Sequence, residues 1–146
     1  MILVVVSTGH FDPLISQCNE LSSRYEFFGQ VGSSRVVPAF PHVKTLSQED
    51  LMAKMREAEL VVSHAGTGML SMLYRLKQKT IVIPKQVRYG ESNDGQVELA
   101  KKWGELGLAV LCMDVDDLEG AIQRCRATEA QFCAQPSLGK HLMSLL

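Results

Sequence analysis

The sequence predicts an α/β fold of the Rossmann-like type, in which helices flank a parallel β-sheet. Short runs of apolar, often β-branched residues alternate with amphipathic stretches of about ten residues, a pattern typical of repeated β-α-β units. Polar segments follow three of the apolar runs directly, at residues 7–12, 63–68 and 84–96. Ligands of such sheets bind beyond the carboxyl ends of the strands. The three segments therefore predict one shared binding site.

The first part of the chain predicts three strands and two helices. Residues 2–6 form a continuous apolar run, typical of a strand buried on both faces of a parallel sheet. Asp12 and Pro13 predict a helix start with the aspartate as N-cap. Residues 47–50 fit a capping box at the start of the second helix. The elements expected here are a strand at 2–6, a helix at about 13–24, short strands at 27–30 and 36–38, and a helix from residue 47.

The second part predicts three more strands, each followed by a helix. Pro84 stops one of these strands and opens a long polar loop, and long ordered loops in compact domains often carry function. The whole chain is expected to form a single domain, with a helical tail over about 127–146. The elements expected here are strands at 60–62, 80–83 and 108–112 and helices at about 69–77, 96–106 and 115–126.

Composition argues against several classes of protein. The 146 residues carry a net charge of −1, which provides no overall electrostatic basis for binding nucleic acid or an anionic membrane. No apolar run is long enough for a membrane span, so a soluble protein is expected. The four cysteines lack the spacing of a zinc site or a disulfide framework. A local basic patch is left open, with the candidates Lys77, Lys79, Lys85 and Arg88.

The segment from His64 to Gly68 carries the clearest binding chemistry. Its two glycines allow a tight turn and a close approach of a ligand to the backbone. The helix that follows presents free N–H groups and the positive end of its dipole, which suit a phosphate or a diphosphate. Thr67 is placed either to cap this helix or to donate its hydroxyl to the ligand. The alternative is a plain strand-to-helix turn in which the glycines serve packing, and the motif alone does not decide between the two.

A family resemblance extends along most of the chain. Residues 58–68, followed after a helical gap by residues 80–84, resemble the C-terminal domain of glycosyltransferase family 28. Residues 88–96 resemble the tyrosine-glycine-glutamate loop of short bacterial capsule and exopolysaccharide subunits of this family, which are split enzymes. Residues 5–14 resemble their opening strand and glycine loop. The likeness covers about 1–125 in order.

The resemblance implies the C-terminal half of a GT-B glycosyltransferase, which binds a UDP-sugar without a catalytic metal or another cofactor. It also implies a separate, membrane-associated subunit that holds a saccharide linked to a polyprenyl diphosphate. This chain would then act in the cytoplasm, at the inner face of the membrane. Gln96 is expected to contact the sugar, and the glycine loops to hold the diphosphate. No catalytic residue is assigned, because the base can belong to the other subunit. The expected substrate-binding residues are Thr8, Gly9, His10, His64, Ala65, Gly66, Thr67, Gly68, Glu91, Asn93, Asp94 and Gln96.

Two positions depart from the family pattern. The family places an acidic residue for the nucleotide ribose in the helix after the glycine loop, and the corresponding residue here is Met72, which we expect to pack in the core. The pair before the glutamine commonly includes a histidine, and here it includes Gly95. Loss of a charge-assisted ribose contact would cost about 1.5–3 kcal/mol. A non-catalytic subunit that supports a partner glycosyltransferase is therefore the alternative function, and an unrelated nucleotide-binding module is a third.

Overall fold

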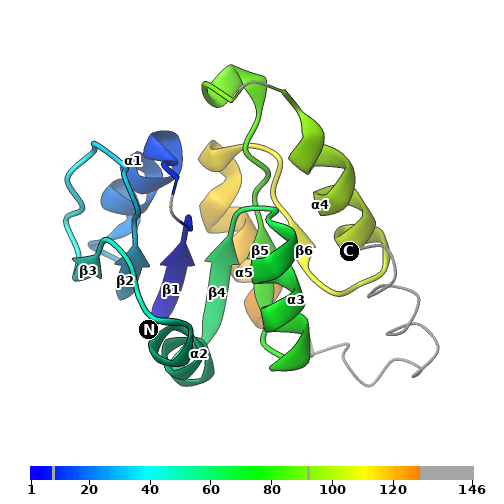
Figure 1. The fold of residues 1–146 in the computed structure, drawn as a ribbon, viewed down its shortest axis with the longest axis horizontal. Helices are drawn as coiled ribbons and strands as arrows, with labels where there is room; N and C mark the ends of the chain where they lie inside the picture. The colour runs from blue at the N-terminus through cyan, green and yellow to red at the C-terminus, as the bar shows by residue number, and fades with distance from the viewer. Residues whose placement is uncertain (8, 92, 129–146) are drawn as a thin grey trace.

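Six parallel strands form one sheet in the order β3-β2-β1-β4-β5-β6 (Figure 1). The computed structural model describes residues 1–7, 9–91 and 93–128. The chain leaves β1 toward one edge and returns to the centre for β4, so the direction of winding reverses between these two strands. The predicted Rossmann-like sheet is confirmed. The strands are β1 (Ile2–Val5), β2 (Phe27–Gln30), β3 (His42–Val43), β4 (Leu60–Ser63), β5 (Thr80–Val82) and β6 (Val110–Leu111).

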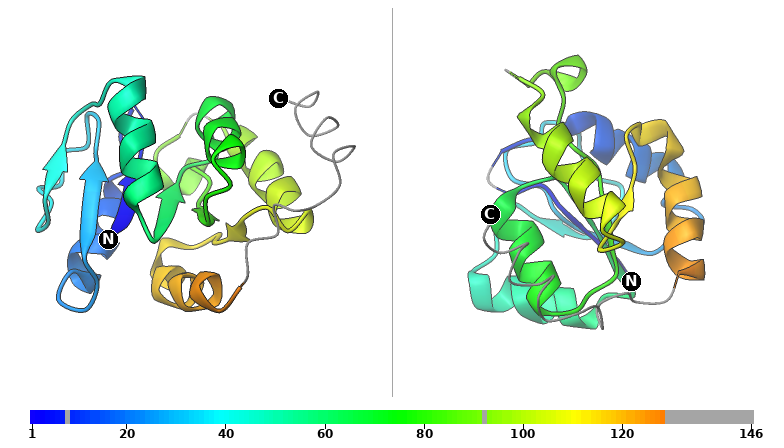
Figure 2. Two further views of the ribbon diagram at one scale, coloured as in Figure 1. Left: turned by 90° about the horizontal axis from the view of Figure 1, so that it is seen from below. Right: turned by 90° about the vertical axis from the view of Figure 1, so that its right-hand side faces the viewer.

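Helices cover both faces of the sheet, which explains why the central strands are continuously apolar (Figure 2). Alternate residues of β1 point to opposite faces: Val4 packs with α1 and α5, whereas Leu3 packs with α2, α3 and α4. Two separate cores result, one on each side of the sheet. The helices are α1 (Asp12–Leu21), α2 (Gln48–Glu57), α3 (Thr67–Arg75), α4 (Gly95–Glu105) and α5 (Leu118–Ala127), with 3₁₀ turns η1 (Val87–Tyr89) and η2 (Val115–Asp117).

The two helix starts predicted in the first part of the chain have different outcomes. Ser47 is the N-cap of α2, and its side chain accepts a hydrogen bond from the backbone N–H of Asp50, as expected. Asp12 is not the N-cap of α1, because the helix begins at Asp12 itself and Phe11 precedes it as N-cap. Instead, the Asp12 carboxylate binds the backbone of the segment between β2 and β3.

The strand predicted at 36–38 is wrong, and polar side chains of α1 explain why. Asp12 Oδ1 accepts hydrogen bonds from the backbone N–H groups of Arg35 (2.7 Å) and Val36 (2.8 Å). Asn19 then donates to the carbonyl of Val37 at 3.0 Å and accepts from the N–H of Ala39 at 2.7 Å. These bonds satisfy the backbone without a strand partner. The chain joins the sheet only afterwards, at β3.

The second part of the chain follows the predicted order with shifted boundaries. The last strand is shorter than the predicted 108–112, and α3 begins at Thr67 rather than at residue 69. Apart from residues 127 and 128, the tail predicted over about 127–146 lies outside the described residues. Within the described parts of the chain, no helix is both long and apolar enough to cross a bilayer.

Candidate functional site

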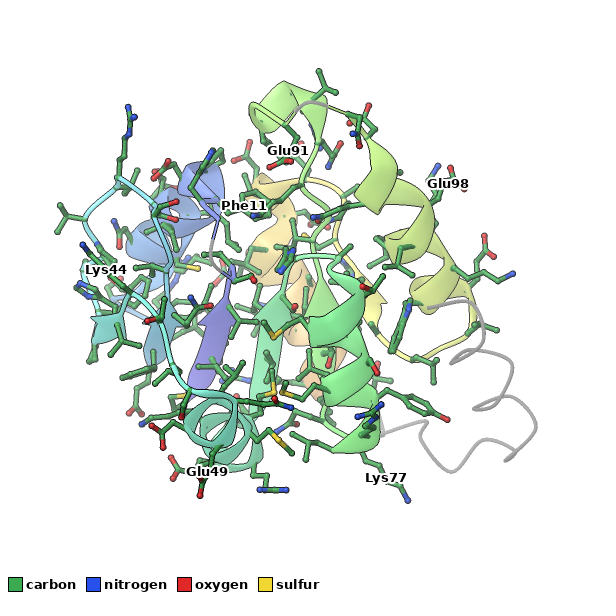
Figure 3. The ribbon with its side chains drawn as sticks, viewed as in Figure 1. Phe11, Lys44, Glu49, Lys77, Glu91 and Glu98 are labelled. Carbon is green, nitrogen blue, oxygen red and sulfur yellow. The ribbon has the colours of Figure 1, made fainter. Side chains whose placement is uncertain are left out.

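The three predicted loops meet at the carboxyl edge of the sheet, above β1, β4 and β5. Figure 3 shows Phe11 and Glu91 at this end of the molecule, with Glu49 and Lys77 at the opposite end. Two polar side chains join the loops. Gln96, in the first turn of α4, connects the loop after β4 with the loop after β5. Lys85, just beyond β5, extends to the loop after β1.

Gln96 holds two loops together through a single amide. Its Oε1 accepts hydrogen bonds from the backbone N–H groups of Ala65 and Lys85, both at 3.0 Å. Its Nε2 lies 3.3 Å from Nδ1 of His64. Sequence reasoning expected Gln96 to contact the sugar, and that contact remains a prediction. The structure adds a positioning role, because each loop turns away from its strand at the residue that Gln96 binds.

The same amide determines the tautomer of His64. Because Oε1 of Gln96 faces two N–H donors, its Nε2 is the donor toward Nδ1 of His64. Nδ1 therefore accepts, and the imidazole hydrogen is on Nε2. This Nε2 is buried and has no hydrogen-bond partner among the residues that the structure describes. A buried N–H without a partner is uncommon in folded proteins, and this one is suited to donate a hydrogen bond to a ligand.

His64 is neutral at physiological pH. Burial lowers its pKa from 6.5 to about 4, and the positive charge of Lys85 acts in the same direction. The side chain thus offers an uncharged N–H donor at the start of α3 and does not act as an ion pair. His64 follows β4 directly, as expected, and its contact with a ligand remains a prediction.

The start of α3 gives its two glycines different roles. Gly66 is the N-cap of the helix and has no side-chain cap, so Thr67 does not cap α3 as sequence reasoning had allowed. A Cβ on Gly66 would lie 2.4 Å from Cε1 of His64, so this glycine is required by packing. A Cβ on Gly68 would meet no atom within 4 Å in the described structure. Gly68 and Thr67 are exposed at the helix end, where the first N–H groups have no partners within the helix.

The loop after β1 is held in a strained conformation. Ser7 has a φ of 66°, in the left-handed region that non-glycine residues rarely adopt. The buried amide of Gln30 binds Ser7 on both sides, accepting from its N–H at 2.9 Å and donating to its carbonyl at 2.7 Å. Thr8 lies outside the described residues. His10 is exposed, with its Nδ1 4.0 Å from the Asp12 carboxylate.

Lys85 was missed as a site residue by sequence reasoning, which placed it only in a possible basic patch. The structure does not form that patch, since Lys79 precedes β5 and Lys85 follows it at the other end of the strand. Lys85 is only 7% exposed. Its Nζ lies 3.5 Å from the carbonyl of Val6, and it lies so close to Gly9 that a Cβ there would be 2.9 Å away. A lysine directly after a buried strand and a proline was the available signal.

The outer part of the third loop makes mainly local contacts. Asp94 Oδ1 accepts from the N–H of Val87 at 2.7 Å, and Asn93 Oδ1 accepts from that of Gly95 at 2.8 Å. The turn of Asn93 also explains Gly95, because a Cβ at this position would lie 2.8 Å from Oδ1 of Asn93. Glu91 is partly buried, and its negative charge acts to raise the pKa of Lys85.

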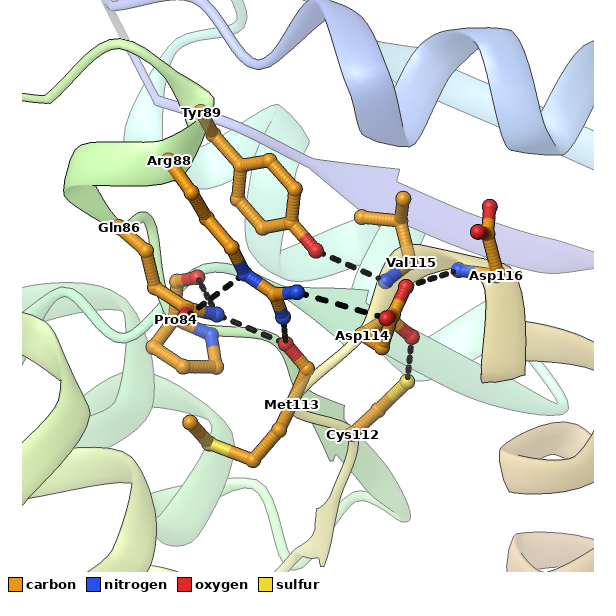
Figure 4. A network of polar contacts seen from close by, with 9 residues as sticks. All are labelled: Pro84, Gln86, Arg88, Tyr89, Cys112, Met113, Asp114, Val115 and Asp116. Atoms are coloured by element: carbon orange, nitrogen blue, oxygen red, sulfur yellow. Dashed lines mark hydrogen bonds and ion pairs between the residues drawn. The ribbon is translucent and has the colours of Figure 1, made fainter.

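A second set of bonds fixes the loop after β5 to the segment after β6 (Figure 4). The Gln86 amide donates to the carbonyl of Met113 at 2.7 Å, and the Arg88 guanidinium donates to the same carbonyl. The backbone N–H of Val115 donates to the Tyr89 hydroxyl at 3.1 Å. This network orders the loop without any ligand.

An apolar side chain fills the position at which the family resemblance implies a ribose-binding carboxylate. Met72 is partly buried and packs against the core formed by α2, α3 and α4, as the sequence predicted. Over the described residues, no three histidine, cysteine or carboxylate side chains are grouped so as to hold a metal ion. Cys18, Cys112 and Cys125 are buried free thiols.

Comparison with known proteins places the chain in a family. The family model for the glycosyltransferase family 28 C-terminal domain matches residues 1–140. The chain belongs to this family. The unrelated nucleotide-binding module considered above is thereby excluded. A search of curated protein sequences returned no match.

Solved structures support the same fold. MurG of Acinetobacter baumannii is 19% identical with a TM-score of 0.66, and the alignment covers 99% of this chain and 50% of MurG. The kitacinnamycin glycosyltransferase is 20% identical with a TM-score of 0.67, covering 97% of this chain and 39% of that one. VinC, a glycosyltransferase solved in complex with dTDP, is 14% identical with a TM-score of 0.59, and the alignment covers 99% of this chain and 38% of VinC. This family 28 domain therefore spans half or less of each of these glycosyltransferases and has the fold of the C-terminal half of a GT-B enzyme.

Packing at Gly66 leads to a stability prediction. We expect Gly66→Ala to lower the unfolding free energy by about 1–3 kcal/mol, because the added methyl overlaps the His64 ring. Urea unfolding measures the change. The double variant His64→Ala with Gly66→Ala should show a smaller loss than the sum of the single variants. If the losses of the two single variants add up to that of the double variant, the contact between Gly66 and the His64 ring is contradicted.

The lowered pKa of His64 predicts a pH dependence of stability. Below its ordinary pKa of 6.5 the unfolded chain takes up a proton that the folded chain excludes until about pH 4, so stability is lost as the pH falls through this range. From about pH 7 to about pH 5 the histidine accounts for a loss of about 2 kcal/mol. Urea unfolding of His64→Gln should lack this component. His42→Gln, which replaces an exposed histidine, should keep it, and equal pH profiles for the wild type and His64→Gln would refute the prediction.

Proposed function

We propose that this chain is the donor-binding subunit of an inverting hexosyltransferase. The enzyme transfers a hexose from a UDP-sugar to a saccharide linked to a polyprenyl diphosphate, without a metal ion, in exopolysaccharide or capsule synthesis. A separate membrane-associated subunit holds the acceptor. The chain works in the cytoplasm and reaches the inner face of the membrane through that subunit.

The observation that carries the proposal is the cluster of free donors at the start of α3. The Nε2–H of His64 has no partner among the described residues, and the N–H groups of the first helical turn lie beside it. Gly68 leaves this helix end open. Donors without matching acceptors suit an anion with several oxygens, such as the diphosphate of a nucleotide-sugar. The site lies where the sheet reverses its winding, which is the usual place for a ligand in this fold.

The chemistry follows from the same geometry. When the sugar is transferred, negative charge increases on the departing nucleotide diphosphate, and donors already in place stabilise that charge. Fixed loops also orient the sugar toward the acceptor. The base that activates the acceptor hydroxyl belongs to the other subunit in this proposal.

Exposed apolar side chains support a separate acceptor-binding subunit. The matched part of this domain corresponds to 50% of MurG and 39% of the kitacinnamycin glycosyltransferase. The two large apolar side chains most exposed in the described structure are Val37 (79%) and Val87 (52%). Val37 lies between β2 and β3, and Val87 begins η1 after β5.

Nucleotide titration tests the proposal directly. Isothermal titration calorimetry with UDP, dTDP and several UDP-sugars should give saturable binding of UDP and of at least one UDP-sugar. Absence of saturable binding by any nucleotide would overturn the donor-binding role. Co-expression with a membrane-associated partner should then allow transfer to a polyprenyl-diphosphate saccharide. Full activity of the isolated chain on a soluble acceptor would show that no partner is needed.

Gly68 separates binding from folding. We expect Gly68→Ala to leave the unfolding free energy unchanged or to raise it by up to ~1 kcal/mol, because alanine favours the helix and its methyl meets no neighbour. UDP affinity should fall by about tenfold or more, since the methyl occupies the approach to the first N–H groups. Calorimetry and urea unfolding measure the two effects. Unchanged UDP affinity would remove the helix start from the donor site.

The alternative is a non-catalytic subunit that supports a partner glycosyltransferase. Met72 favours it, because an apolar side chain occupies the position at which the family resemblance implies a ribose-binding carboxylate. Met72→Glu distinguishes the two functions. In a catalytic subunit that has adapted to this loss, the variant should bind UDP at least as well as the wild type and keep transfer activity with its partner. A partner that transfers sugar equally well with a Gly68→Ala chain would favour the supporting role.

A further inference from the structure

Lys85 is a buried cation with few partners among the residues that the structure describes. Among the lysines and arginines of the described structure, it alone is less than a tenth exposed. The only hydrogen bond recorded for its ammonium there is the 3.5 Å contact with the carbonyl of Val6. Ion pairs are found for five other lysines and arginines of the described residues and for none at Lys85. An ammonium has three donors, and burying them unpaired is costly.

The path of the side chain places this ammonium at the centre of the sheet edge. Lys85 follows β5, whereas Val6 and Gly9 follow β1, and β4 lies between those two strands. The lysine therefore crosses the end of β4, next to His64, whose pKa its charge lowers. Its end lies beyond the carboxyl end of β1, and the winding of the sheet reverses between β1 and β4.

Gly9 makes this arrangement possible. A Cβ on Gly9 would stand 2.9 Å from Nζ, so any other residue there would displace the ammonium. The backbone N–H of Lys85 is bound by Gln96, which fixes the start of the side chain. The backbone of the lysine is thus fixed by Gln96, and its ammonium fits beside Gly9.

We propose that Lys85 binds the diphosphate of the nucleotide donor and supplies the positive charge that stabilises this group during transfer. The proposal rests on the function proposed above. Lys85 complements the donors of His64 and α3, because these N–H groups are uncharged, whereas a diphosphate carries negative charge that the ammonium can neutralise. Burial lowers the pKa of Lys85, while the nearby charge of Glu91 opposes this shift. A bound diphosphate would restore a full partner to the ammonium.

A substitution of Lys85 tests the proposal with three probes. Inorganic pyrophosphate, UDP and uridine are titrated onto the wild type, Lys85→Met and Lys85→Gln by calorimetry. Lys79→Met, at the other end of β5, is the control. We expect both Lys85 variants to lose about tenfold to a hundredfold in affinity for UDP and pyrophosphate, with uridine affinity unchanged. Their unfolding midpoints in urea should equal or exceed that of the wild type, because a poorly paired buried charge has been removed.

The outcomes separate this proposal from the one on which it rests. If Lys85→Met binds UDP as strongly as the wild type does, the role of Lys85 is overturned and the donor-binding function stays intact. Equal losses for UDP and uridine, or unfolding of both variants, overturn it as well, because they show a structural role. Pyrophosphate binding that depends on Lys85, without any nucleotide binding, supports Lys85 and overturns the nucleotide donor. A wild type that binds none of the three probes overturns both proposals.

Discussion

The site depends on one amide, that of Gln96, at the point where the central sheet ends. The last ladder bond between β5 and β4 runs from the N–H of Ile83 to the carbonyl of Ser63. Beyond it the strands diverge, and the N–H groups of Ala65 and Lys85 have no opposing strand. Gln96 Oε1 accepts from both, which continues the pairing with a side chain from α4. Without this acceptor, two backbone donors would be left unpaired at the base of the site.

Several properties of the site follow from that amide. Its nitrogen faces His64 and thereby keeps the imidazole hydrogen on Nε2, pointing away from Gln96. The His64 ring then occupies the space beside Gly66, which only a glycine leaves free. On the other loop, the bound backbone of Lys85 directs its side chain past β4 to β1. The edge that results carries the ammonium of Lys85 and the Nε2–H of His64, two donors that favour an anion.

The sequence predicted much of this region, and its failures have specific causes. The alternation of strands and helices, the glycine loop and Gln96 were recognisable because each depends on a local pattern or a short motif. The strand expected at 36–38 failed because Asp12 and Asn19, distant in sequence, satisfy that backbone with their side chains. Lys85 was overlooked for a similar reason. A lysine after a strand is usually solvated, and only packing against Gly9 reveals that this one is buried.

The sequence by itself determined the sheet, because the apolar runs of β1, β4 and β5 are stable only with helices on both faces. It also determined which loops follow those strands, and hence that they share one edge. Tertiary structure alone decided what each polar side chain does there. The roles of these side chains depend on neighbours from other parts of the chain. Such neighbours decide that Gln96 holds two loops, that Nε2 of His64 carries the hydrogen and that Lys85 is buried. Hydrogen bonds over such separations leave no periodic pattern in the chain, whereas burial of whole strands does.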